Sequence, residues 1–310
     1  MRILVAGNKG QLATDLKEAA VRQGMDLVAF GRPELDLTDR LAAERCIQRV
    51  RPSIVINAGA YTAVDKAESE PDLAFAVNTD GPARLAAACA RAGIPLIHIS
   101  TDQVFGDNRA VPHREIDAPA PLCVYGRSKL EGEQAVAAAQ ADHVIARVSW
   151  VFGPTGDNFV KKVLSWAETS FDTGRPLRIV ADQWGKPTYS PDLAEALLNI
   201  AICRLATSEA ATTRGLFHLA GSTALTRADQ AQLILDAARA RGFPAIKVTP
   251  VTSEQFPTPA RRPSNGMLDT SKAYETFGIQ LGSFEDALER TLERLIGPRG
   301  GQFRAVRAAG

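Results

Sequence analysis

Long apolar runs are missing from this sequence. No stretch approaches the ~20 apolar residues that a helix needs to cross a bilayer. Residues 1–7 pass from a short apolar segment directly into a glycine. A secretory signal has a longer apolar stretch and a cleavage site, so we expect none here. These absences predict a cytoplasmic protein with no membrane partner.

An excess of charge of one sign is also missing. Lys and Arg total 36 against 35 Asp and Glu, so the formal net charge is +1. Proteins dedicated to nucleic acid normally show a basic excess, so we expect no nucleic-acid partner. With 45% hydrophobic and 23% charged residues, the composition is that of an ordinary globular protein. A length of 310 residues suits two domains or one large one.

Cysteine and histidine are scarce, with four of each. The cysteines have neither a CxxC pair nor a histidine partner at metal-ligand spacing, which predicts reduced thiols and no metal site. His98 and His218 lie in apolar segments, where core positions are expected. The cysteines are Cys46, Cys89, Cys123 and Cys203.

The first half of the chain alternates short apolar segments with longer helical patterns. Several of the short segments lack polar alternation, as expected of parallel strands covered on both faces. The pattern predicts an α/β fold with a Rossmann-type, doubly wound parallel sheet. The expected strands are 2–6, 26–30, 53–57, 95–100 and 143–147, and the expected helices are 11–23, 40–50, 71–92 and 126–139.

The second half is less regular and predicts a smaller C-terminal α/β domain for substrate. Four prolines make the loop 250–265 extended. Helices are expected at 158–169, 192–205, 226–241 and 283–296, and strands at 176–180 and 215–220. We expect a dinucleotide-binding domain at 1–150 with 186–220, a substrate domain at 151–185 with 221–297, and a flexible tail at 298–310.

A glycine turn joins the first strand to the first helix. Gly7 and Gly10 permit a tight turn and close approach of a pyrophosphate, and Ala13 is small enough for helix–strand packing. Gln11 and Leu12 open the helix, whose N-terminus attracts phosphate. The spacing GxxGxxA predicts a dinucleotide site, although a plain strand–turn–helix remains an alternative.

The end of the second strand indicates which dinucleotide is used. An NAD-binding protein usually places an acid there for the ribose hydroxyl. Here Arg32 follows Gly31, and a guanidinium suits a 2′-phosphate. NADPH is therefore the expected cofactor, with NADH accepted less well, although a solvated surface arginine is an equal alternative. The other residues expected on the cofactor are Asp36, Leu37, Ala58, Gly59, Ala60 and Tyr61.

Tyr125 and Lys129 stand four residues apart, on one face of an expected helix. A free phenol has a pKa near 10, and a neighbouring ammonium lowers it. We therefore expect Lys129 to lower the pKa of Tyr125 and make it a proton donor. Alone, YxxxK also arises by chance.

The end of the fourth strand supplies a partner for this pair. Thr101 ends that strand, at the sheet edge where open α/β folds bind ligands. Its hydroxyl is placed to hydrogen-bond a substrate carbonyl together with Tyr125. The glycine turn, Thr101 and the Tyr–Lys helix occur in the right order for one site, which predicts catalysis by Thr101, Tyr125 and Lys129.

These features together resemble the extended short-chain dehydrogenase/reductase family. Within it, the chain is similar to the dTDP-4-dehydrorhamnose reductase branch, from Met1 to about Ile296. The segments that carry the resemblance are 57–68, 100–105, 147–152 and 257–265.

The resemblance implies reduction of the 4-keto group of dTDP-4-dehydro-L-rhamnose to give dTDP-L-rhamnose. It implies that Tyr125 protonates the developing alkoxide and that Lys129 holds the nicotinamide ribose. Thr101, Asp102, Gln103, Trp150 and Arg262 are the implied substrate residues, with Trp150 on the sugar or nucleotide and Arg262 on the diphosphate. From the residues alone, Trp150 also reads as a core aromatic and Arg262 as a loop arginine.

Two departures from the branch keep alternatives open. The branch usually has tyrosine where this chain has Gln103, so another 4-keto nucleotide sugar, reduced or epimerised, is an alternative substrate. Some members form a metal-bridged homodimer through two glutamates, and the matching positions here are Asp15 and Pro191. A homodimer remains an expectation without a complete metal site. A catalytically silent NADP-binding regulatory subunit is the alternative from another class.

Overall fold

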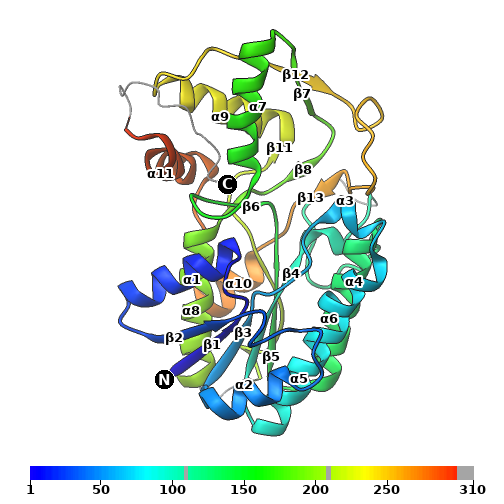
Figure 1. Cartoon of the computed structure of the whole chain (residues 1–310), viewed down its shortest axis with the longest axis vertical. Helices are drawn as coiled ribbons and strands as arrows, with labels where there is room; N and C mark the ends of the chain where they lie inside the picture. Colours follow the sequence, from blue (N-terminus) through cyan, green and yellow to red (C-terminus); the bar gives the residue numbers. More distant parts are fainter. Residues whose placement is uncertain (108–110, 207–210, 299–310) are drawn as a thin grey trace.

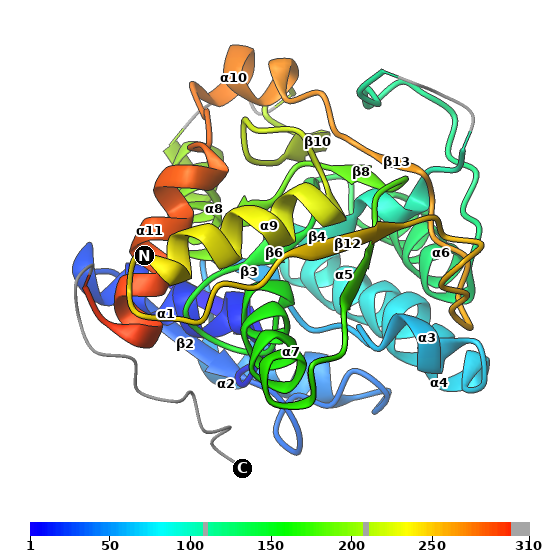
Figure 2. The same cartoon turned by 90° about the horizontal axis from the view of Figure 1, so that it is seen from above.

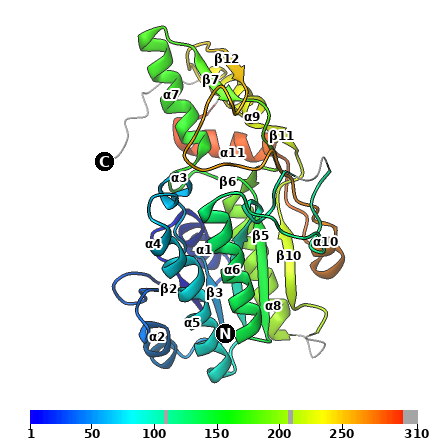
Figure 3. The same ribbon diagram turned by 90° about the vertical axis from the view of Figure 1, so that its right-hand side faces the viewer.

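The structure is a computed structural model that describes residues 1–107, 111–206 and 211–298, and it shows two lobes along the long axis (Figure 1). The lower lobe contains the large sheet. The upper lobe holds the helices α7 (Phe159–Thr173), α9 (Arg227–Arg239) and α11 (Phe284–Ile296). The two views at right angles place this lobe above the upper edge of the sheet (Figures 2 and 3).

The large sheet has six strands in the order β2-β1-β3-β4-β5-β10, and every neighbouring pair is parallel. The expected doubly wound parallel sheet is confirmed. The order reverses between β1 and β3, and ligands bind outside the carboxyl ends of the strands at such a point. The strands are β1 (Arg2–Ala6), β2 (Asp26–Phe30), β3 (Ile54–Asn57), β4 (Leu96–Thr101), β5 (His143–Val148) and β10 (Gly215–Leu219).

Helices cover both faces of this sheet, which explains the continuous apolar strands. Ile3 and Val5 of β1 pack into the core beneath α1 and α8, whereas Leu4 and Ala6 pack into the core on the opposite face. This alternation follows from the two-residue period of a strand. The first face carries α1 (Gln11–Arg22) and α8 (Ser190–Ala206), and the second carries α2 (Ala42–Val50), α5 (Gly81–Ala92) and α6 (Val124–Ala139).

The expected single helix 71–92 is interrupted. The structure has α4 (Pro71–Phe75), one π-helical turn η1 (Ala76–Asp80) and then α5. A π turn inserts one extra residue and is common near functional sites. A Cβ built at Gly132 of α6 would lie 2.1 Å from the Asn78 carbonyl oxygen, so glycine is required where the π turn crosses α6.

The upper lobe has its own core. The parallel pair β7 (Leu177–Val180) and β12 (Val248–Val251) lies beside α7, α9 and α11. The expected helices and the strand at 176–180 are present, and Ser283 caps α11 through the backbone N–H of Asp286. Among the described residues, nine short elements have no counterpart in the sequence prediction, namely α3 (Val64–Ala67), α10 (Ser271–Phe277), η2 (Asp102–Val104), β6 (Val151–Phe152), β8 (Trp184–Gly185), β9 (Thr188–Tyr189), β11 (Leu225–Thr226), β12 and β13 (Asn265–Gly266).

Side-chain contacts fasten the lobes together. Thr155 donates a hydrogen bond to each carboxylate oxygen of Asp15 in α1, both at 3.0 Å. The division into two domains at the expected boundaries stays a prediction. Of the expected tail, residues 299–310 lie outside the described part of the chain. Across the described ranges, every helix is too short or too polar to span a bilayer.

Candidate active site

Thr101 and Tyr125 meet at the carboxyl end of β4. Thr101 ends that strand, and its hydroxyl acts on the Tyr125 phenol by lowering its pKa. The Thr101 hydroxyl also donates to Asp102 Oδ1 at 3.0 Å and accepts from the Gln103 backbone N–H at 3.2 Å. Both hydroxyls are therefore held in one place, as the order of the motifs along the chain led us to expect.

The electrostatic environment of Tyr125 corrects one expectation. Burial raises the pKa of the phenol well above its usual range, the Thr101 hydrogen bond lowers it, and Asp102 and Cys123 add to the rise. Lys129 is not among the groups that shift it, because its side chain points toward the strand β4 and not toward the phenol. The predicted lowering of the Tyr125 pKa by Lys129 is wrong for this structure. A protonated phenol is nevertheless the form that donates a proton.

Lys129 is buried between α6 and the sheet. Its Nζ donates to the backbone oxygen of Ile99 at 2.7 Å and lies 3.4 Å from His98 Nε2. Burial lowers the pKa of Lys129 to about 8, and Glu133 opposes that shift. The ammonium therefore loses its proton within the range in which an enzyme is assayed.

The helix α6 that carries Tyr125 and Lys129 is fixed at its start. The Cys123 Sγ accepts from the Gly126 backbone N–H at 3.3 Å, and Glu68 Oε1 accepts from the Val124 backbone N–H at 2.7 Å. Glu68 belongs to the 57–68 segment that carried the family resemblance, so part of that motif serves to hold the catalytic helix.

Asn78 of the π turn braces the same helix further along, and the sequence analysis missed it. Its Nδ2 donates to Ser128 Oγ and to the Tyr61 backbone oxygen, both at 3.0 Å. Its Oδ1 accepts from the Tyr61 backbone N–H at 2.8 Å. The Tyr61 hydroxyl is bound to Glu70 Oε2 at 2.8 Å. The side chain of Tyr61 thus has a structural partner, and its backbone follows the expected cofactor segment.

Asp102 and Gln103, two expected substrate residues, bind within the protein. Ser149 Oγ donates to Asp102 Oδ2 at 3.2 Å, and a Cβ built at Gly266 would lie 2.3 Å from the same oxygen. Burial raises the pKa of Asp102 to about 6. Gln103 Oε1 accepts from the Cys123 thiol at 3.6 Å. Asp102 therefore joins β4 to the upper lobe.

The expected dinucleotide turn lies at the switch point of the sheet. Gly7 has φ +108°, and a Cβ there would lie 3.1 Å from the Gly59 backbone nitrogen. Glycine is thus needed both for the backbone conformation and for the approach of the β1 and β3 loops. Gly10 is the N-cap of α1, with extended dihedral angles and no side-chain cap. The N-terminus of this twelve-residue helix faces the same region and suits a phosphate.

Gln11 links this turn to the upper lobe. Its Oε1 accepts from Asn158 Nδ2 at 3.1 Å, and a Cβ at Gly156 would lie 2.7 Å from the Gln11 Cβ. Its Nε2 is buried without a hydrogen-bond partner among the described residues. A buried donor of this kind beside a helix N-terminus fits an anionic group of a cofactor.

The other expected cofactor residues surround this turn. Leu37 packs between two glycines, because a Cβ at Gly59 would lie 3.1 Å from Leu37 Cδ1 and one at Gly81 would lie 2.7 Å from Leu37 Cβ. Asp36 Oδ1 is engaged by the Thr38 backbone N–H at 2.9 Å and by its hydroxyl at 2.8 Å. Leu12 is half-buried against the core, and Ala58 and Ala60 flank Gly59.

Arg32 is exposed directly after β2, where the sequence placed it. A Cβ at Gly31 would lie 2.5 Å from Asn8 Oδ1, so the space over Gly31 holds the Asn8 side chain. The exposed guanidinium of Arg32 and the tight packing at Gly31 fit a site for the adenosine end of a dinucleotide that carries a 2′-phosphate.

Trp150 stands between the lobes with both ring faces covered. A Cβ at Gly185 would lie 2.2 Å from the indole, and the guanidinium carbon of Arg227 is 3.4 Å from the ring centroid. Burial lowers the pKa of Arg227 to about 9, and Asp102 opposes that shift. The sequence analysis missed Arg227, because it lies in the first turn of an ordinary amphipathic helix, 77 residues from Trp150.

Arg262 forms an ion pair across the same region. Its Nη2 donates to Asp65 Oδ2 at 2.8 Å and its Nη1 to Thr258 Oγ1 at 2.7 Å. It therefore ties the proline-rich loop to α3. Positive charge from Arg227 and Arg262 meets near the sheet edge, and the two guanidinium groups act on each other.

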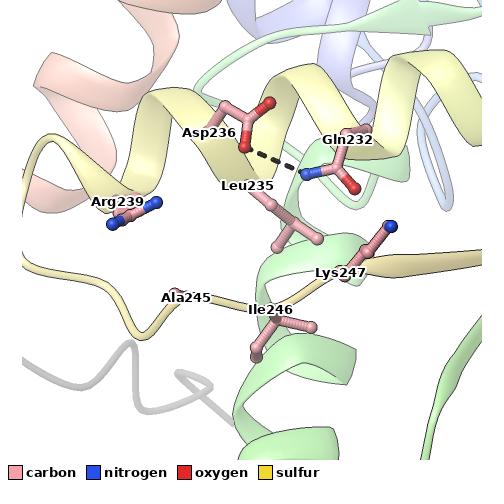
Figure 4. A pocket seen from close by; sticks show the side chains of 7 residues that line it. All are labelled: Gln232, Leu235, Asp236, Arg239, Ala245, Ile246 and Lys247. Carbon is pink, nitrogen blue, oxygen red and sulfur yellow. Dashed lines mark hydrogen bonds between the residues drawn. The ribbon is translucent and has the colours of Figure 1, made fainter.

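A surface pocket lies away from this site, in the upper lobe between α9 and residues 245–247 (Figure 4). Gln232 Nε2 donates to Asp236 Oδ1 at 3.0 Å on its rim. None of the expected catalytic residues lines it. Among the described residues, no cluster of three or more His, Cys, Asp or Glu side chains forms a metal site.

The comparisons with known proteins agree with this arrangement. The family model described as the RmlD substrate binding domain matches residues 1–296. The dTDP-4-dehydrorhamnose reductase of Sinorhizobium fredii is 45% identical, over 96% of this chain and 98% of that protein.

Two solved structures extend the comparison to the fold. A dTDP-4-dehydrorhamnose reductase of Clostridium acetobutylicum has a TM-score of 0.86 at 33% identity, covering 94% of this chain and 99% of that one. The Bacillus anthracis reductase, solved in complex with NADP, has a TM-score of 0.83 at 33% identity, covering 94% and 98%. The chain belongs to the dTDP-4-dehydrorhamnose reductase family.

Proposed function

We propose that the protein uses NADPH to reduce the 4-keto group of dTDP-4-dehydro-L-rhamnose, giving dTDP-L-rhamnose. The observation that carries the proposal is the pair of hydroxyls at the end of β4, where Thr101 acts on the pKa of the Tyr125 phenol. Family membership supports the substrate, and the NADP complex of a relative supports the cofactor.

The two hydroxyls suit the reduction of a carbonyl. NADPH supplies the hydride that the carbonyl carbon receives. Thr101 hydrogen-bonds the carbonyl oxygen, and Tyr125 transfers its phenolic proton to that oxygen as negative charge develops. The raised pKa of Tyr125 keeps the proton in place until the oxygen becomes basic. Lys129 holds the nicotinamide ribose from the next turn of the same helix.

The residues around the glycine turn hold the cofactor in this proposal. The backbone N–H groups of Gly10, Gln11 and Leu12 receive the pyrophosphate, because a helix N-terminus favours negative charge. Gly7 keeps the turn open by its positive φ. Arg32 binds the 2′-phosphate in solvent, so NADPH is preferred and NADH is still accepted. Asp36, Leu37, Ala58, Gly59, Ala60 and Tyr61 line the adenosine and ribose side.

The substrate lies between the sheet edge and the upper lobe. Asp102, Gln103 and Trp150 contact the sugar side, with Trp150 using a ring edge because both its faces are covered. Arg262 contacts the diphosphate. In this scheme the dinucleotide domain comprises 1–150 with 186–220, and the substrate domain comprises 151–185 with 221–297.

A second 4-keto nucleotide sugar is the alternative substrate. Gln103 stands where a tyrosine is usual in this branch, and its amide oxygen is bound to the Cys123 thiol at 3.6 Å. Its contact with the sugar therefore differs in chemistry from that of a phenol. Comparison of substrates is the direct way to separate the two.

The test is NADPH consumption with dTDP-4-dehydro-L-rhamnose beside other 4-keto nucleotide sugars, with Thr101→Val and Tyr125→Phe as matched controls. Turnover by the wild type that both substitutions abolish supports the proposal. NADPH binding without turnover of any of these sugars contradicts it and favours a silent regulatory subunit.

The cellular setting follows from the same proposal. Both NADPH and nucleotide sugars are small, charged and made in the cytoplasm, so we place the protein there. A homodimer is the assembly that we expect. Cell fractionation tests the first inference, and light scattering of the purified protein tests the second.

A further inference from the structure

His98 lies in the middle of β4, three residues before Thr101, and is fully buried. Its ring stands between Lys129 and Asn57, the residue that directly precedes the expected cofactor residues 58–61. Nδ1 is 3.0 Å from Asn57 Nδ2 of β3, and Nε2 is 3.4 Å from Lys129 Nζ of α6. Both ring nitrogens therefore have a polar neighbour, as a buried imidazole requires, and one of these neighbours is Lys129.

The orientation of Asn57 determines which ring nitrogen carries the proton. Asn57 Oδ1 accepts from the Gly59 backbone N–H at 3.2 Å, so the amide nitrogen must face His98. An amide nitrogen only donates, and the Nδ1 atom of His98 is therefore an acceptor. Burial, together with Lys129 and His143, holds the pKa of His98 well below its usual range, so the ring is neutral. A neutral ring with an accepting Nδ1 has its proton on Nε2.

This tautomer matters to Lys129. The Nε2–H group points at Nζ, which also donates to the Ile99 backbone oxygen at 2.7 Å. Two donors that face each other disfavour the ammonium form of the lysine. Burial also lowers the pKa of Lys129, and Glu133 of the same helix raises it.

We propose that His98 is a positioning residue for Lys129, and that its Nε2-protonated ring transmits the contact between Asn57 and the Gly59 loop to the lysine. A change at the Gly59 loop that turned the Asn57 amide would reverse the tautomer, and Nε2 would then accept from the ammonium. The loop that contacts the dinucleotide is thereby linked to the charge of Lys129. This inference rests on the proposed function only in giving Lys129 a role at the cofactor.

The first test needs no activity. Protein labelled with ¹⁵N in its histidines gives ring signals that distinguish the tautomers, and loss of one set in His98→Asn assigns them. We expect His98 to carry its proton on Nε2 and to remain neutral well below the usual titration range of a histidine. A proton on Nδ1, or titration near pH 6.5, overturns the proposal even if the enzyme reduces no keto sugar.

The second test separates positioning from packing by two variants. His98→Asn places an amide near Nδ1 and retains the Asn57 partner, whereas His98→Gln places one near Nε2 and retains the lysine partner. His98→Asn removes the Nε2–H donor that faces Lys129 Nζ, and this loss should raise the pKa of Lys129. The basic limb of kcat/KM for NADPH should then move up by about one pH unit in His98→Asn, the worth of one hydrogen bond.

The size of the activity loss completes the comparison. We expect kcat/KM to fall about five- to tenfold in His98→Asn and by less in His98→Gln. Tyr274→Phe, on an exposed tyrosine of α10, is the control and should leave the limb in place. A folded His98→Asn protein with an unshifted limb contradicts the proposal, as does equal loss in both variants with no shift. If His98→Asn does not fold, the ¹⁵N signals of the wild-type histidine and the pH profile of His98→Gln still test the proposal.

Discussion

The guanidinium of Arg227 lies 3.4 Å from the centre of the Trp150 ring, so a residue of the upper lobe covers an aromatic side chain of the lower one. Arg227 is a cation in a buried place, with Asp102 as a nearby carboxylate. A diphosphate brought to this region would relieve that unfavourable burial. We therefore expect Arg227 to contribute to the binding of an anionic substrate.

Replacing Arg227 with glutamine should weaken nucleotide-sugar binding and leave cofactor binding unchanged. Loss of one charge-assisted hydrogen bond raises KM about tenfold or more. Arg227→Lys retains the charge, so its KM for the sugar should lie between those of the wild type and Arg227→Gln. Steady-state kinetics with varied sugar, together with NADPH binding measured by fluorescence, check this. A larger change in NADPH affinity than in KM for the sugar would place Arg227 on the cofactor side.

Tyr125→Phe should reduce kcat about 10²–10⁴-fold, the usual worth of general acid catalysis. The ring and the helix α6 remain, so the Kd for NADPH should be nearly unchanged. Tyr274→Phe, on an exposed tyrosine, is the control. More than about a tenth of wild-type kcat in Tyr125→Phe excludes the phenol as the proton donor.

Arg32→Ala should remove most of the preference for NADPH over NADH. A guanidinium bound to a 2′-phosphate is worth about ten- to a hundredfold in affinity, less in salt because the side chain is exposed. The measurement is kcat/KM for both cofactors at low and moderate salt, with Arg40→Ala as an exposed control. An unchanged ratio means that Arg32 is only a surface charge.

Asp102→Asn should change the pH dependence of stability. Burial raises the pKa of Asp102 from 3.8 to about 6, so the folded chain holds this proton more tightly than the unfolded chain does. Stability is therefore lost as the pH rises from about 4 through 6, and the loss is complete above that range. The Asp102→Asn variant has no such loss. The difference between its Tm and that of the wild type should therefore increase as the pH rises from about 4 to 6.

The control for that experiment is Asp72→Asn, on the exposed first turn of α4. Thermal unfolding from pH 4 to pH 8 gives the Tm of each protein. If the curves of Asp102→Asn and wild type run parallel, the Asp102 carboxyl is not a strained buried charge.

The parts of the fold that sequence predicted are those with a strong local pattern. β1 and β2 begin and end where expected, because each is a short run that is apolar after its first residue, Arg2 or Asp26. Two-residue strands such as β8 show no periodicity, and only contacts with distant segments define them. The π turn depends on the crossing of Gly132 and Asn78, which a sequence does not reveal.

The site divides in the same way. Thr101, Tyr125 and Lys129 were found because each follows or lies on a regular element. Arg227 was not found, because its partner Trp150 is 77 positions away in the sequence. The Asn57–His98 contact was not found either, because the two residues are 41 positions apart. His98 was correctly expected in an apolar strand, but its two polar partners come from neighbouring elements. The direction of the Lys129 side chain was also beyond reach, because spacing on a helix fixes a face and not a rotamer.

The contacts between Thr155 and Asp15 have a thermodynamic consequence. Asp15 is almost wholly buried in the lower lobe, yet its carboxylate depends on Thr155 of the upper one. Two further hydrogen bonds connect the lobes, from Asn158 to Gln11 and from Arg262 to Asp65. If the upper lobe unfolded alone, the buried Asp15 carboxylate would lose Thr155 as a donor, and this state would be costly. We therefore expect both lobes to unfold in one cooperative transition, with equal calorimetric and van't Hoff enthalpies.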